Sequence, residues 1–88
     1  MKLSNNKQLY DYLAVLATAL SQAGAAQLSE SVLAASRTAW GTPATEFLGE
    51  SRIVLRRVLD MDAGLLTEGQ RSDLIDVLGQ LDVALDER

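Results

Sequence analysis

Residues 40–51 read WGTPATEFLGES, and they lie at the junction that decides the fold. Gly41 can end one helix and Thr42 can cap the next. Pro43 suits the first helical position, because a proline lacks the N–H group that would have no partner there. Glu46 then lies near the positive end of the new helix dipole. This stretch therefore predicts a turn between two helices rather than a functional loop.

On both sides of this turn, apolar residues recur at the spacings of three and four that mark one face of a helix. Helices are predicted over about residues 6–23, 25–40, 43–60 and 68–86. Their expected buried stripes are Leu9, Tyr12, Leu13, Leu16, Leu20 and Ala23 in the first; Ala25, Leu28, Val32, Ala35 and Ala39 in the second; Phe47, Val54, Val58 and Met61, beside Leu48, Leu55 and Leu59, in the third; and Leu74, Leu78, Leu81 and Leu85 in the fourth. No stretch shows convincing strand alternation. The sequence predicts an all-α protein, a compact antiparallel four-helix bundle in a single domain over residues 1–88.

Capping residues support three of these helix ends. Asn5 or Asn6 can accept a hydrogen bond from the free amides of the first turn, and Gly24 can take the left-handed conformation that ends a helix. Thr67 is followed three residues later by Gln70, which is the spacing of a capping box. These signals predict the start and end of the first helix and the start of the last.

Three segments of the predicted helices form a pattern that resembles small uncharacterised bacterial helical proteins. They are LAVL at Leu13–Leu16, AGAAQLSESV at Ala23–Val32 and TPATEFLGESRIVLR at Thr42–Arg56. With the first three predicted helices taken as a whole, the resemblance covers over half of the chain. It implies a fold and not an activity, so no functional residues are carried over from it.

The composition excludes several kinds of chemistry. The chain has no cysteine and no histidine, so disulfides, zinc–sulfur sites and the commonest general base are absent. Asp60, Asp62, Gly64 and Glu68 lack the spacing of a calcium loop. Ser72 precedes Asp73, the reverse of the Asp-Ser-Leu order of acyl carrier proteins, and is expected in the first turn of the last helix. We expect no enzyme activity, no metal and no cofactor.

Charge is distributed unevenly along the chain. The formal net charge is −4, which argues against general affinity for nucleic acid. Residues 60–88 hold eight of the twelve acidic groups and two of the eight basic ones. Arg52, Arg56 and Arg57 form a basic face at helical spacing. This candidate electrostatic face is expected to pair with the acids of the last helix, with phosphate binding as the alternative.

The apolar runs are too short to span a membrane, and the first residues lack the hydrophobic region of a signal peptide. We therefore expect a soluble bacterial protein of the cytoplasm.

The leading functional hypothesis is a non-enzymatic protein–protein interaction module: an adaptor, a regulator or a self-associating accessory protein. Leu33, Trp40 and Ile53 lie off the predicted buried stripes and are candidate contact residues, most simply for a symmetric homodimer. The alternative for these residues is that some helices touch two neighbours, which widens their buried faces. A small acidic inhibitor of a basic partner, like an immunity protein or an antitoxin, is a second hypothesis, and a nucleic-acid-associated regulator is a third.

Overall fold

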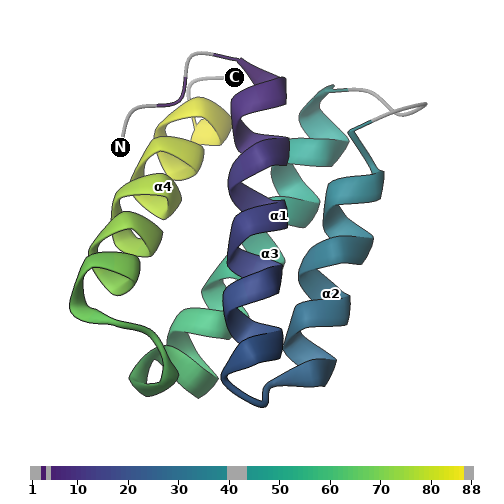
Figure 1. Cartoon of the computed structure of the whole chain (residues 1–88). Coiled ribbons are helices and arrows are strands. Elements are labelled where there is room, and N and C mark those ends of the chain that lie inside the picture. Colours follow the sequence, from purple (N-terminus) through teal and green to yellow (C-terminus); the bar gives the residue numbers. More distant parts are fainter. Residues whose placement is uncertain (1–2, 4, 40–43, 87–88) are drawn as a thin grey trace.

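The computed structural model describes residues 3, 5–39 and 44–86, which form four α-helices and one short 3-10 helix (Figure 1). The elements are α1 (Asn6–Gln22), α2 (Ala26–Arg37), α3 (Ala44–Asp62), the 3-10 helix η1 (Ala63–Leu65) and α4 (Glu68–Asp86). Successive helices run in opposite directions, and α1 with α2, α2 with α3 and α3 with α4 pack closely. The predicted all-α four-helix bundle is confirmed.

The first helix begins and ends as its capping residues predict. The Asn5 side chain accepts a hydrogen bond of 2.9 Å from the backbone N–H of Gln8. Gly24 has a φ of 89°, in the left-handed region where a side chain would be strained. The amides of Gly24 and Ala25 donate to the carbonyls of Ser21 and Leu20, and this pattern satisfies the last carbonyls of α1.

The last helix begins with the predicted capping box. The Gln70 amide N–H donates to the Thr67 hydroxyl over 3.1 Å, and the Thr67 N–H donates to the Gln70 side-chain oxygen over 2.9 Å. Two otherwise unpaired donors are therefore satisfied reciprocally. The bounds of α4 agree with the prediction at both ends.

Two helix ends differ by two or three residues from the approximate predicted bounds. α2 ends at Arg37 rather than near residue 40, because the backbone tightens there: the N–H of Thr38 donates to Ala35 and that of Ala39 to Ser36. The Thr38 hydroxyl also donates to the Ala35 carbonyl over 2.7 Å. α3 continues to Asp62, two residues beyond its predicted end. The predicted turn at Gly41, Thr42 and Pro43 lies outside the described residues.

All four helices contribute one stripe to the core. The buried apolar residues are Leu9, Tyr12, Leu13, Leu16, Ala17, Leu20, Leu28, Val32, Ala35, Phe47, Val54, Leu55, Val58, Leu66, Leu74, Val77, Leu78 and Leu81. Ala23 and Met61 were expected on these stripes but are exposed. Met61 lies in the last turn of α3 and borders an open hollow that Gly24 and Ala25 also line.

Candidate functional site

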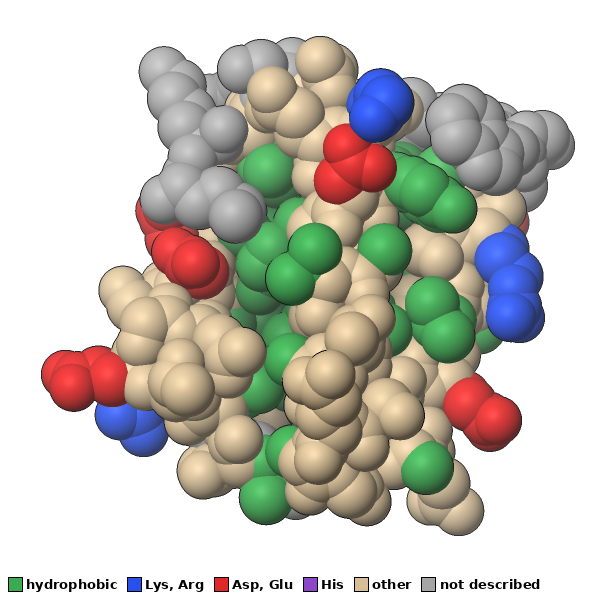
Figure 2. All heavy atoms as spheres, viewed as in Figure 1, with side chains coloured by type: hydrophobic (Ala, Val, Ile, Leu, Met, Phe, Trp, Pro, Cys, Tyr) green, Lys and Arg blue, Asp and Glu red, His purple; other side chains and the backbone are tan. Residues whose placement is uncertain are grey.

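The bundle is open on one side. α1 and α4 are neighbours around the bundle, but they are not among the helix pairs that pack closely. Between them is an open groove of about 380 Å³, which we call the α1–α4 groove. Figure 2 shows a strip of apolar side chains running along this side of the molecule. The residues that line the groove are Leu3, Gln8, Asp11, Tyr12, Val15, Leu16, Ala19, Gln70 and Asp73.

One wall of the α1–α4 groove is an apolar face of α1. Tyr12, Val15, Leu16 and Ala19 follow the spacing of three and four that places side chains on one helical face. Leu16 is buried, whereas Val15 is 68% exposed and stands at the surface. This face is broader than contact with α2 requires, and its outer part has no covering helix among the described residues.

Tyr12 brings an unpaired polar group into this apolar wall. Its side chain is 8% exposed, and its hydroxyl is buried without a hydrogen-bond partner among the described residues. Burial raises the pKa of the Tyr12 phenol far above its ordinary value, and the negative charge of Asp73 raises it further. The hydroxyl is protonated at neutral pH, as that of an ordinary tyrosine is, and it can donate one hydrogen bond and accept others.

Carboxylates lie at the edge of the groove. Asp73, in the second turn of α4, is half-buried and forms no ion pair with any described residue. Asp11 is paired with Lys7 over 2.9 Å, but both side chains are largely exposed, so this pair is easily exchanged. The groove thus combines an apolar wall with a negative edge.

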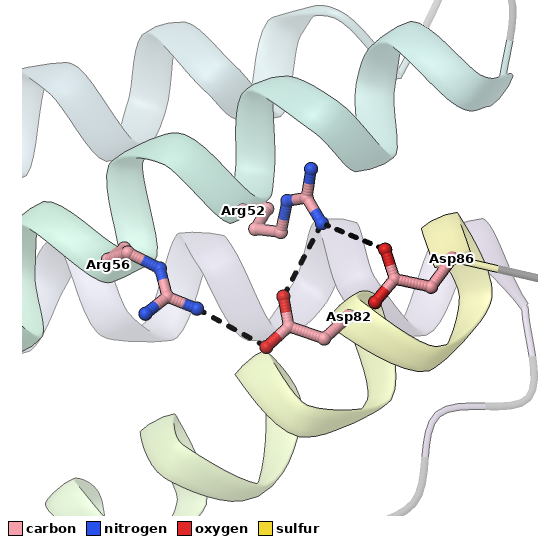
Figure 3. A network of polar contacts seen from close by, with 4 residues as sticks. All are labelled: Arg52, Arg56, Asp82 and Asp86. Atoms are coloured by element: carbon pink, nitrogen blue, oxygen red, sulfur yellow. Dashed lines mark hydrogen bonds and ion pairs between the residues drawn. The ribbon is translucent and has the colours of Figure 1, made fainter.

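The arginine face lies on another side of the bundle, between α3 and α4. Arg52 and Arg56 contact the Asp82 carboxylate at 3.5 and 3.2 Å, and Arg52 lies 3.9 Å from Asp86 (Figure 3). The predicted pairing with the acids of the last helix is confirmed for these two arginines. Arg57 has no ion pair among the described residues; it borders a shallow hollow that Ile53 also lines.

The candidate contact residues are placed differently. Ile53 is exposed on α3, as its position off the stripe predicted. Leu33 is partly buried on α2 and packs against the core, as a helix with two neighbours would allow. Ile53 lines the hollow beside Arg57, and Leu33 does not line that hollow. Trp40 lies outside the described residues, so the proposed patch stays a prediction.

The described residues bring no metal-binding group of three acidic side chains together. None of the described helices is long and apolar enough to cross a membrane. Comparisons of this chain with protein-family models, with curated proteins and with solved structures give no match. The resemblance to small bacterial helical proteins thus extends only to a small all-helical fold.

The sequence reasoning missed the α1–α4 groove. Tyr12 was placed on the buried stripe, but it was not combined with Val15, Leu16 and Ala19. The signal was the width of the apolar face of α1, which is larger than one neighbouring helix covers. Nothing in the sequence predicted that α4 would stand away from this face.

Proposed function

We propose that this protein is a non-enzymatic protein–protein interaction module. The observation that carries the proposal is the α1–α4 groove, which is mostly apolar and open at the surface. The other pairs of neighbouring helices in the bundle pack closely. Exposed apolar surface that is contiguous and edged by polar groups is typical of sites that bind another protein. An adaptor or a regulator would use the groove to hold one partner.

The rest of the molecule favours binding over chemistry. The chain contains no histidine and no cysteine, so neither residue type can act together with the carboxylates at the groove edge. The arginine face is a weaker candidate, because Asp82 and Asp86 neutralise much of the charge of Arg52 and Arg56. This pairing also lowers the expected affinity for nucleic acid, since the same guanidinium groups would have to leave their carboxylates to bind phosphate.

A small acidic inhibitor is the second candidate. It is favoured by the concentration of acidic residues in 60–88 and by the location of one of them, Asp73, at the α1–α4 groove. An inhibitor of this kind covers a basic surface on its target. It differs from an adaptor in that binding abolishes the activity of the partner.

Site-specific photocrosslinking in the native cell tests the proposed function. A photoreactive phenylalanine is placed at Val15, in the groove, and separately at Val83, a control position on α4 outside it. Both side chains are exposed, at 68% and 57%. We expect covalent adducts to one defined protein from position 15 and few from position 83. Equal labelling from the two positions, or none from position 15, would contradict the proposal.

A further inference from the structure

The shape of the α1–α4 groove limits what can occupy it. Its two sides are helices, and every regular element among the described residues is helical, so they offer no sheet edge to which an extended peptide could add a strand. A helix satisfies its own backbone and presents side chains at spacings of three and four, which match those of Tyr12, Val15, Leu16 and Ala19. The groove therefore suits a fifth helix that packs between α1 and α4.

The charges at the groove favour a helix whose groove-facing side chains are positively charged. Asp73 is half-buried and has no ion pair among the described residues, and Asp11 lies at the same groove. A lysine or arginine on the incoming helix would neutralise the charge of these carboxylates when the helix covers the groove and displaces water from it. A second copy of this chain has the wrong sign, because it carries a net charge of −4 and would bring its own acidic groove residues to the contact.

The Tyr12 hydroxyl gives the groove a polar feature that packing of the free protein leaves unused. It is buried without a hydrogen-bond partner among residues 3, 5–39 and 44–86, although the side chain lies close enough to Asp73 for that charge to raise its pKa. A lysine ammonium that reaches Asp73 has three donors, and the phenolic oxygen can accept from one of them if the Tyr12 ring shifts to expose it. Binding would then remove the cost of an unsatisfied buried hydroxyl as well as that of an unpaired carboxylate.

We propose that the α1–α4 groove binds an amphipathic helix of another protein, whose apolar side chains pack on Val15, Leu16 and Ala19 and whose lysine or arginine pairs with Asp73 beside the Tyr12 hydroxyl. The inference rests on the proposed function and adds the chemical class of the partner. The groove would then recognise its partner both by the shape of the apolar face and by the charge of the basic side chain.

A designed peptide tests the inference. The probe is an amphipathic peptide of about 18 residues, similar in length to α1, with leucines at helical spacing and lysines beside them. A second peptide carries glutamate in place of every lysine. Binding is measured by titration calorimetry and is located by amide chemical shifts. We expect the lysine peptide to shift the groove residues of α1 and α4, and the glutamate peptide to bind at least about tenfold more weakly.

Two matched pairs of variants distinguish contacts in the groove from the general effect of the same substitution elsewhere on the surface. Asp73→Asn is compared with Asp60→Asn, which removes the same charge from an exposed site on α3 outside the groove. Val15→Ser is compared with Val83→Ser. We expect Asp73→Asn to weaken the lysine peptide about tenfold and Asp60→Asn less than about twofold, since hydrogen bonds to charged groups are the strong ones. Val15→Ser should weaken it severalfold, and Val83→Ser should leave it unchanged.

The outcomes distinguish this inference from the proposed function. If the glutamate peptide binds equally well, or if Asp73→Asn and Asp60→Asn have the same effect, the basic helix is refuted while the groove remains a binding surface. If Val15→Ser and Val83→Ser are also equivalent, or the shifts lie outside α1 and α4, or neither peptide binds at millimolar concentration, the groove itself is refuted as the docking site.

Discussion

Two buried serines allow the same substitution to be tested in opposite environments. Ser29 on α2 is 6% exposed, and its hydroxyl donates a 2.7 Å hydrogen bond to the Ala17 carbonyl of α1. Ser51 on α3 is 0% exposed, and its hydroxyl has no hydrogen-bond partner among the described residues. Replacement by alanine removes one oxygen in each case and leaves almost no cavity, so the hydrogen-bonding state of the hydroxyl decides the result.

The expected effects have opposite signs. Ser29→Ala loses a bond between two helices, which lowers the free energy of unfolding by about 0.5–1.5 kcal/mol. Ser51→Ala removes an unsatisfied buried hydroxyl, whose desolvation costs about 1–3 kcal/mol, and therefore stabilises the protein. The higher helix propensity of alanine favours both variants and largely cancels between them. We therefore expect the two variants to differ by about 1.5–4.5 kcal/mol.

Urea unfolding followed by far-UV circular dichroism measures this difference. The whole domain is expected to have about 4–13 kcal/mol of stability by the per-residue rule, so the gap is well above the error of the method. Equal slopes of the two transitions would serve as the control that the unfolded states are comparable. If Ser51→Ala destabilises the protein as much as Ser29→Ala does, the reasoning on unsatisfied hydroxyls is refuted.

Three further predictions concern the turn, the ion pairs and self-association. Gly24→Ala should destabilise the protein by about 1–2 kcal/mol, because the backbone there is left-handed. Gly79→Ala, on α4 with open space around the added methyl group, should stabilise the protein by about 0.5–1 kcal/mol. Thermal unfolding should show shifts of opposite sign in the midpoint temperatures of the two variants. Asp82→Asn should cost less than about 2 kcal/mol, and less still in high salt, because both of its ion pairs are solvated; an unchanged cost in high salt would contradict this. If the predicted homodimer forms, light scattering should give a dimer's mass, and Trp40→Ala and Ile53→Glu should each give a folded monomer; a wild-type monomer at high concentration would contradict it.

The sequence by itself determined the local structure of this protein. The period of apolar residues gave the four helices, because side chains three and four apart share a face whatever that face packs against. Asn5, Gly24 and the pair Thr67 and Gln70 marked helix ends, because each satisfies backbone groups within a few residues of itself. The position of Ile53 opposite the stripe predicted its exposure for the same reason.

Only the tertiary structure decided whether each helical face packs against another helix or contacts solvent. Met61 continues the stripe of α3, yet it is exposed, because its burial depends on whether a neighbouring helix extends that far. Tyr12 lies on the α1 stripe as predicted, but only the packing of the helices leaves its hydroxyl buried without a hydrogen-bond partner in the part of the chain that the structure describes. The α1–α4 groove arises from the spacing of two helices that are far apart in the sequence. Helical periodicity fixes the direction of a side chain about its own axis, but it contains no information on the distance to the next helix.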